Sequence, residues 1–328
     1  MPVMLTGNDV YRQSKQVWNQ FGESKWIPFS KSNLQKQHKD SEGLKNIGVG
    51  KWLVLAATGE SLEEAIPHLK KYRDRIDILT CDKGFGMLLE KGIKADFVMV
   101  CDCNILFKWV KPYIGETRGV KLISTLYANP DWINAWLGDR YFYVNKDAIM
   151  SEQIFKEIAG DTLRIIPASS NVSNAMLVFF IGSDDKIKTN FAGYEKYLLT
   201  GYDYSWKPKG NYYSFTDPKP KRYYMNHRTM LDYKRDVCFT SENLFFSAKW
   251  LYSYITVHGL PVVNCSERGL LDIPLKSTIE NELKQAPTKE QTKNISGNYE
   301  VTQKTYEAFM AAKTHFDNSR EVIQNGRW

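Results

Sequence analysis

The chain has 328 residues, of which 43% are hydrophobic and 25% are charged. This usage is ordinary for a globular protein and excludes a chain that is disordered throughout. The formal net charge of +7 is compatible with nucleic acid, an anionic membrane surface or an anionic small substrate, and it does not choose among them.

The N-terminus, residues 1–19, is polar and lacks the apolar core of a signal peptide. No stretch approaches the roughly 20 apolar residues that cross a bilayer. We therefore expect no transmembrane segment and a cytoplasmic location. The five cysteines are scattered and form no CxxC pair, which favours reduced thiols over a zinc site.

A polar, helical extension is expected over residues 1–48, and the pattern then changes to alternating strands and helices. Short apolar runs at 51–57, 76–81 and 96–101 are typical of strands buried on both faces. Helices are expected between them at 62–73, where Pro67 would kink or shorten the helix, and at 84–91, ended by Gly92. Later candidates are strands at 120–126, 140–144, 163–166, 197–200 and 260–264, and helices at 151–158, 172–181, 243–257 and 302–323.

This alternation predicts an α/β fold with a doubly wound, mostly parallel sheet. Right-handed crossovers place the carboxyl ends of such strands on one edge, where ligands bind. We expect a core domain over residues 49–275, preceded by the extension 1–48 and followed by a linker and terminal helix over 276–328.

The turn after the first strand, Thr58-Gly59-Glu60-Ser61, is the first candidate for ligand binding. Gly59 would let the backbone approach a ligand, and the following helix offers free N–H groups to a phosphate. Ser61 would cap that helix or bind a phosphate oxygen. Glu60 is unfavourable beside a phosphate, and an ordinary capped turn explains this motif equally well.

Two further sets of polar residues follow strands. Asp82, Asp102 and Asp203 each come at the end of a predicted strand, where acids either bind a ribose, a base or a metal or simply cap helices. A cluster of small polar residues, Ser170, Asn171 and Ser173, precedes an apolar helix and offers hydrogen bonds to a ligand or a cap to that helix.

A basic and aromatic segment spans Trp206–Arg235. Such a segment either binds phosphates and stacks its rings on bases or sugars, or forms a solvated loop whose tyrosines are fixed by packing. His227 lies within it and is the best-placed histidine for proton transfer, although a lone histidine is more often structural.

Taken in order, these motifs resemble the MptE-like family of 6-hydroxymethylpterin diphosphokinases, which also includes the central domain of the Maf flagellin glycosyltransferases. The family has a Gly-Pro-Ser-Leu turn, a helix ending in Gly-Ile, and a Pro-Asp pair before a strand that closes on Asp. The chain departs from this pattern at Glu60 and Ala95, each of which replaces a proline. It matches the pattern at Gly59, Ser61, Leu62, Gly92, Ile93, Asp96 and Asp102.

The second half, with "PASSNVSNAMLVFF" and "YLLTGYDYSW", is also similar to bacterial sialyltransferases that use CMP-sugars. In those enzymes a histidine downstream of a Gly-x-Asp strand end acts as base, and His227 falls in the corresponding stretch. The resemblance covers 48–272 and implies a Rossmann-like fold, an insertion near 182–194 and a lid over 206–235.

The resemblance implies a transferase with a nucleotide-linked donor, most simply a glycosyltransferase with a CMP-nonulosonate donor and an acceptor that the sequence leaves unidentified. Asp203 and His227 would then lie at the reacting centre. The donor would contact Gly59, Glu60, Ser61, Asp82, Asp102, Ser170, Asn171 and Ser173. The alternatives are a diphosphokinase, with Mg²⁺ held by Asp102 and Asp203, and a non-catalytic protein that binds a nucleotide, a carbohydrate or, less favoured, nucleic acid.

Overall fold

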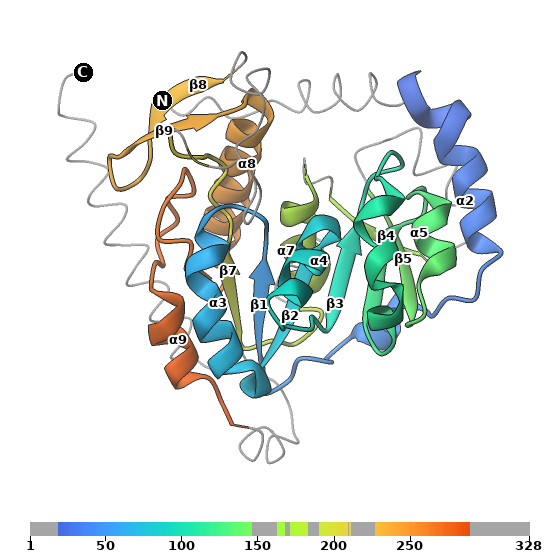
Figure 1. Ribbon diagram of the computed structural model, residues 1–328, viewed down its shortest axis with the longest axis horizontal. Helices are drawn as coiled ribbons and strands as arrows, with labels where there is room; N and C mark the ends of the chain where they lie inside the picture. The colour runs from blue at the N-terminus through green and yellow to red at the C-terminus, as the bar shows by residue number, and fades with distance from the viewer. Residues whose placement is uncertain are drawn as a thin grey trace. The chain divides into compact units, whose positions relative to one another are not determined.

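The computed structural model describes residues 19–145, 163–167, 171–182, 190–208, 210 and 227–288 (Figure 1). The predicted helices at 151–158 and 302–323 lie outside these residues. Among the described residues the main sheet has eight strands in the order β10-β7-β1-β2-β3-β4-β5-β6, and β8 and β9 form a separate pair. The predicted α/β, Rossmann-like fold is confirmed. The strands are β1 (Trp52–Ala56), β2 (Ile76–Cys81), β3 (Phe97–Val100), β4 (Lys121–Thr125), β5 (Arg140–Asn145), β6 (Arg164–Ile166), β7 (Lys196–Thr200), β8 (Arg228–Leu231), β9 (Val237–Thr240) and β10 (Val262–Asn264).

The described residues belong to two compact units. The first takes its residues from Met1–Ile47, Leu55–Thr58 and Asp77–Gly193, and the second from Gly48–Val54, Gly59–Ile76 and Tyr194–Trp328. The helices of the first unit are α2 (Ile27–Leu34), α4 (Asp82–Glu90), α5 (Pro130–Ala135) and α7 (Val172–Ile181), and those of the second are α3 (Ser61–Lys71), α8 (Glu242–His258) and α9 (Ile279–Gln285). Short 3₁₀ or π turns occupy Gly22–Trp26, Ser41–Leu44, Arg73–Arg75, Phe107–Trp109 and Lys111–Thr117.

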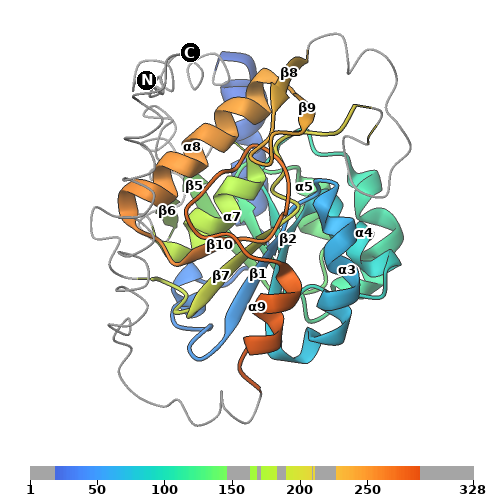
Figure 2. The same cartoon turned by 90° about the vertical axis from the view of Figure 1, so that its left-hand side faces the viewer.

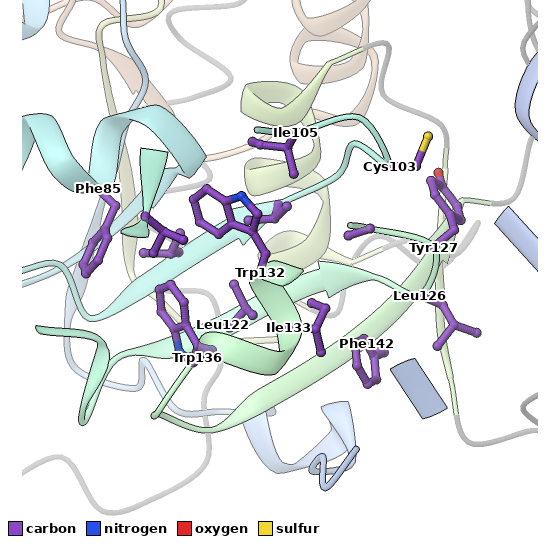
Figure 3. Close-up of a cluster of buried hydrophobic side chains, with 14 of the residues drawn as sticks. Phe85, Cys103, Ile105, Leu122, Leu126, Tyr127, Trp132, Ile133, Trp136 and Phe142 are labelled. Atoms are coloured by element: carbon purple, nitrogen blue, oxygen red, sulfur yellow. The ribbon is translucent and has the colours of Figure 1, made fainter. Parts of the chain in front are cut away.

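In the first unit, strands β2 to β6 are joined by parallel ladders, with Thr80 opposite Val98 and Ser124 opposite Phe142. Side chains of one parity, among them Val98 and Phe142, join a core that also includes residues of α4 and α5 (Figure 3). Side chains of the other parity contact α7, since Phe97 packs on Phe180 and Tyr143 on Phe179. Because successive strand residues point to opposite faces, this part of the sheet is covered by helices on both sides.

The described part of the polar extension is helical up to Leu34, and a short 3₁₀ turn follows at Ser41–Leu44. Helix α2 packs against α5, and both belong to the first unit (Figure 1). Trp26 stacks on Tyr127 with ring centroids 4.3 Å apart, and the Asn33 amide donates to the Leu126 and Ala128 carbonyls, each at 2.9 Å. These contacts attach the extension to the loop after β4.

In the second unit, β7 and β10 pair in parallel, with Tyr197 opposite Val262. Helix α3 packs against β7 and α9, and α9 lies beside it in Figure 2. Pro67 lies inside α3, yet the helix continues unbroken from Ser61 to Lys71. Pro67 therefore does not end α3, which stops at Lys71, two residues before the predicted end.

Two elements of the second unit differ from expectation. The segment 206–235 that we expected to form a lid contains β8, which pairs with β9 just beyond the segment in an antiparallel hairpin with Leu231 opposite Val237. The stretch directly after residue 275, for which we expected no helix, contains α9, whose first turn is capped by the Thr278 hydroxyl. No helix in the part of the chain that the structure describes is long and apolar enough to cross a membrane.

The core of the first unit should be sensitive to truncation. Phe142 is 1% exposed within the cluster of Figure 3, so Phe142→Ala should lower the free energy of unfolding by about 3–5 kcal/mol. Leu137, which is 49% exposed, is the control. Leu137→Ala should change the free energy of unfolding by less than about 0.5 kcal/mol. Urea unfolding measures both, and equal effects would contradict the assignment of this core.

Candidate functional site

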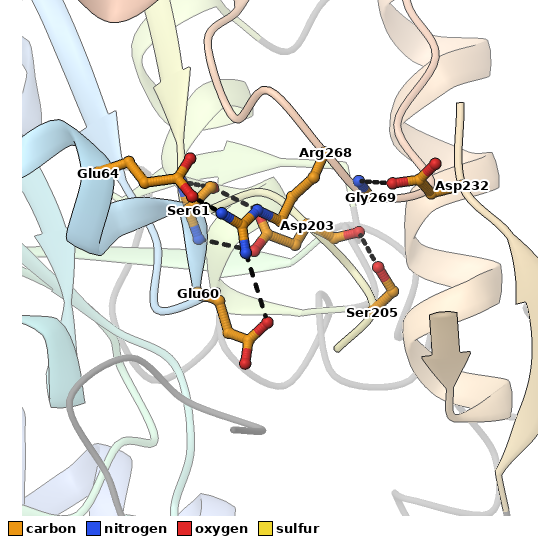
Figure 4. A network of polar contacts seen from close by, with 9 residues as sticks. Glu60, Ser61, Glu64, Asp203, Ser205, Asp232, Arg268 and Gly269 are labelled. Atoms are coloured by element: carbon orange, nitrogen blue, oxygen red, sulfur yellow. Dashed lines mark hydrogen bonds and ion pairs between the residues drawn. The ribbon is translucent and has the colours of Figure 1, made fainter. Parts of the chain in front are cut away.

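The turn after β1 is bound to the residues that follow β7, all within the second unit from Gly59 onward. The Gly59 amide donates to the Gly201 carbonyl at 2.9 Å. The Ser61 amide donates to Oδ2 of Asp203 at 2.9 Å, and the Ser61 hydroxyl donates to Oδ1. The Gly201 amide in turn donates to the Ser61 hydroxyl at 3.1 Å. The structure therefore brings together Gly59, Ser61 and Asp203, three of the predicted site residues (Figure 4).

The N-terminus of α3 already binds an anionic group, and that group is the chain's own carboxylate. The free N–H groups and the dipole of a helix N-terminus stabilise negative charge, and Asp203 lies where we expected a phosphate oxygen. Asp203 is 1% exposed. Ser61 thus has a structural partner that its sequence position did not reveal, 142 residues away along the chain.

Burial raises the pKa of Asp203 to about 7, although the hydrogen bonds from Ser61 oppose this shift. The negative charge of Glu60 raises the pKa further, and Lys207 lowers it. Such a value allows a carboxyl group to exchange its proton near neutral pH, which is the range in which a general acid or base works.

Glu60, the unfavourable residue of the turn, lies toward Arg268. Its Oε2 atom is 3.6 Å from Nη1 of Arg268, and Nη2 of Arg268 contacts Glu64 on the next turn of α3 (Figure 4). The Arg268 side chain is 18% exposed. Its positive charge offsets two carboxylates at the start of α3. The sequence analysis missed Arg268, because an isolated arginine in a loop carries no local signal.

The loop that carries Arg268 is held against Asp203. The Leu270 amide donates to the Asp203 carbonyl at 2.9 Å, and the Tyr202 amide donates to the Ser266 hydroxyl at 2.9 Å. Gly269 has φ of +98°, and a Cβ atom there would lie 2.2 Å from the Asp203 carbonyl oxygen. Only glycine fits this approach.

The hairpin β8–β9 is attached to the same loop through Asp232. One of its carboxylate oxygens accepts the amides of Lys234 and Asp236 at 2.8 and 2.9 Å, and the other accepts the Gly269 amide at 3.3 Å. His227 comes immediately before β8, and its ring packs on Phe239 with centroids 4.2 Å apart. The structure therefore places His227 on the hairpin, and its role as a base stays a prediction.

The remaining candidates belong to the first unit. Asp82 begins α4 after β2, and Asp102 follows the neighbouring strand β3. Burial raises the pKa of Asp82, and the negative charge of Asp102 also raises it. One oxygen of Asp102 accepts the Asn104 amide at 2.7 Å, which is an ordinary turn contact.

Asn171 and Ser173 form a helix cap in this structure. The Asn171 side chain accepts the Asn174 amide at 2.9 Å and the Ser173 hydroxyl at 2.8 Å at the start of α7. Ser170 lies outside the described residues. Among the described residues, no group of three or more His, Cys, Asp or Glu side chains is arranged to hold a metal ion. The binding of Mg²⁺ by Asp102 and Asp203 in a diphosphokinase stays a prediction.

A model of the family described as 6-hydroxymethylpterin diphosphokinase MptE-like matches residues 30–209, which is more than half of the chain. The chain belongs to the MptE-like family. This membership confirms the resemblance drawn from the Gly59 turn and the strand ends. No protein with a curated description matches the chain significantly.

Among solved structures, this MptE-like chain is similar to the MAf glycosyltransferase from Magnetospirillum magneticum AMB-1. The TM-score is 0.53 at 14% identity, and the match covers 88% of this chain and 42% of that one. The chain thus spans less than half the length of that structure. The likeness supports the Rossmann-like fold.

Close packing at Gly59 should make the turn intolerant of a side chain. A Cβ atom there would lie 2.6 Å from the Gly201 carbonyl oxygen and 2.8 Å from the Asp203 carboxylate. Gly59→Ala should lower the free energy of unfolding by about 1–3 kcal/mol. Gly115→Ala is the control, because its Cβ would meet nothing within 4 Å. Denaturant unfolding tests the pair, and a neutral Gly59→Ala would contradict the contact with Gly201.

The raised pKa of Asp203 predicts a pH-dependent contribution to stability. The ordinary pKa of the group is 3.8, and the folded value is about 7, so between these values only the folded state holds the proton. The contribution of the protonated Asp203 to the free energy of unfolding is therefore full below about pH 4 and is lost as the pH rises through 7. The stability of the wild type relative to Asp203→Asn should therefore fall between pH 5 and pH 8.

Urea unfolding of both proteins at intervals from pH 5 to pH 8 measures this difference. Carbon-13 NMR of the Asp203 carboxyl group gives the midpoint directly. A stability difference that is constant over this range, or an NMR midpoint below pH 5, would contradict the raised pKa.

Proposed function

We propose that this MptE-like chain is a glycosyltransferase that uses a nucleotide-linked sugar, with a CMP-nonulosonate as the donor type. The observation that carries the proposal is the binding of Asp203 at the N-terminus of α3. A carboxylate held by the Ser61 amide and hydroxyl supports an anion site built at this turn, in a family described as 6-hydroxymethylpterin diphosphokinase MptE-like.

In this proposal the donor phosphate displaces the Asp203 carboxylate from Ser61. Displacement would leave the N–H groups of α3 to the phosphate, and it would return Asp203 toward solvent beside the reacting centre. A carboxyl group with a pKa near 7 is able to accept a proton from an acceptor hydroxyl at neutral pH. Asp82, Asp102, Ser170, Asn171 and Ser173 would contact the base and ribose, and His227 is a second candidate for the base.

The family description supports one alternative, a 6-hydroxymethylpterin diphosphokinase that uses ATP and Mg²⁺. Phosphoryl transfer depends on positioning and on neutralising phosphate charge, so it needs no strong base. The two proposals differ in the nucleotide and in the need for a divalent metal.

A ligand panel separates these functions. Melting temperatures are measured with millimolar CMP, CDP, UDP, GDP, ADP and ATP, each with and without Mg²⁺. We expect stabilisation by cytidine nucleotides without metal. Stabilisation by ATP only with Mg²⁺ would instead favour the diphosphokinase, and no response to any nucleotide would leave a non-catalytic binding protein.

The variant Ser61→Ala should abolish the shift caused by cytidine nucleotides. Its own cost in stability should be about 1–3 kcal/mol, because Asp203 loses a buried hydrogen bond. Ser41→Ala is the matched control: Ser41 is also buried, its hydroxyl donates to the Phe142 carbonyl at 2.9 Å, and it belongs to the other unit. The control should lose stability and keep the nucleotide response, and a loss of response in both variants would contradict the role of Ser61.

A further inference from the structure

A pocket of about 170 Å³ opens beside the Gly59 turn, entirely within the second unit. Its walls come from the start of α3, the segment after Asp203, the hairpin β8–β9 and the loop after β10. Glu60 lines the pocket, whereas Ser61 and Asp203 do not. The volume lies well below the several hundred Å³ of sites for drug-sized ligands, so it suits a single ring and not a whole nucleotide.

The walls carry charges of both signs. Five carboxylates and three cationic side chains line the pocket. Arg268 faces Glu60 and Glu64, and the Asp232 carboxylate is occupied by the backbone amides of the hairpin turn and of Gly269. These contacts hold four of the charged groups in place.

Two lining carboxylates, those of Glu267 and Asp236, have no hydrogen bond or ion pair to any other residue in the described part of the chain. Glu267 is half-buried and has φ of +54°, a left-handed conformation that costs a residue with a side chain about 1–2 kcal/mol. The amide of the neighbouring Ser266 donates to the Asn264 side chain at 3.0 Å, which anchors the backbone just before Glu267. Glu267 lines the pocket from this loop.

Trp206 is among the lining residues but is only 3% exposed. Its backbone pairs with Phe239 through two hydrogen bonds of 2.8 Å, which fixes this segment against the hairpin. Lys207 and Lys234 supply N–H donors on the same pocket. The site thus offers acceptors and donors within the space of one ring.

This combination distinguishes among small ligands. The charged groups that remain beside those four are two carboxylates and two lysines, so a phosphate and an amine would each meet charges of their own sign. A hydroxyl group both donates and accepts, so a neutral polyol satisfies walls of mixed charge with no net repulsion.

We propose that this pocket binds one neutral sugar residue, with Glu267 and Asp236 accepting hydrogen bonds from its hydroxyl groups. Its assignment as the acceptor subsite rests on the proposed glycosyltransferase function. The binding of a sugar does not depend on that function.

Saturation-transfer NMR and calorimetry test the proposal with methyl glycosides of glucose, galactose, mannose and N-acetylglucosamine at up to 20 mM. We expect at least one of them to bind the wild type, with an affinity that changes less than twofold between 50 and 500 mM NaCl. Glu267→Gln should weaken binding at least fivefold. Glu63→Gln is the control, because Glu63 is exposed on α3 and does not line the pocket.

If Glu267→Gln does not fold, as judged by its melting curve, Asp236→Asn takes its place with the same expected loss. The proposal is overturned if no glycoside binds, or if both pocket variants bind the glycosides as tightly as the wild type. It is also overturned if only sugar phosphates or amines bind and added salt abolishes their binding.

The nucleotide panel, repeated on Glu267→Gln, separates this proposal from the proposed function. Glycoside binding without any nucleotide response would overturn the glycosyltransferase and keep the sugar pocket. An intact nucleotide response without glycoside binding would overturn the pocket alone.

Discussion

In the second unit, the carboxylate of Asp203 lies at the N-terminus of α3, where it accepts the amide and the hydroxyl of Ser61. Removing a carboxylate from water costs several kcal/mol, and the helix dipole and these two hydrogen bonds offset that cost in part. The close contact of Gly59 with Gly201, the bend of the chain after β7 and the approach of Gly269 all follow from bringing this group to the helix. The same burial raises the pKa of Asp203 to about 7, so the carboxyl group keeps its proton up to nearly neutral pH.

Much of the α/β architecture could be predicted from the sequence, because buried parallel strands have a strong local pattern. The apolar runs at 51–57, 76–81 and 96–101 correspond to β1, β2 and β3. Hairpin β8–β9 was not predicted because its strands are short and β8 is largely exposed, and charged and aromatic residues around them hide the alternation. Pro67 is accommodated inside α3, which is continuous from Ser61 to Lys71.

The candidate site was only partly accessible to sequence reasoning. Gly59, Ser61 and Asp203 were selected for a ligand, and their contact with one another depends on two segments separated by 142 residues. Asn171 and Ser173 illustrate the opposite case, since the capping of α7 accounts for the contacts described for them. Glu60 looked unfavourable in isolation, and Arg268, more than 200 residues later, supplies the charge that the local sequence lacks.

The carboxylate of Asp232 bonds both to the turn of the hairpin and to the loop that carries Glu267 and Arg268. The Tyr233 amide also donates to the Gly269 carbonyl at 3.1 Å, so a displacement of the hairpin is transmitted to that loop. Substitutions on the surface of the hairpin preserve this link as long as Asp232 is retained. The outer face of the hairpin is thus free to diversify among related chains while the spacing of the groups beneath it stays the same.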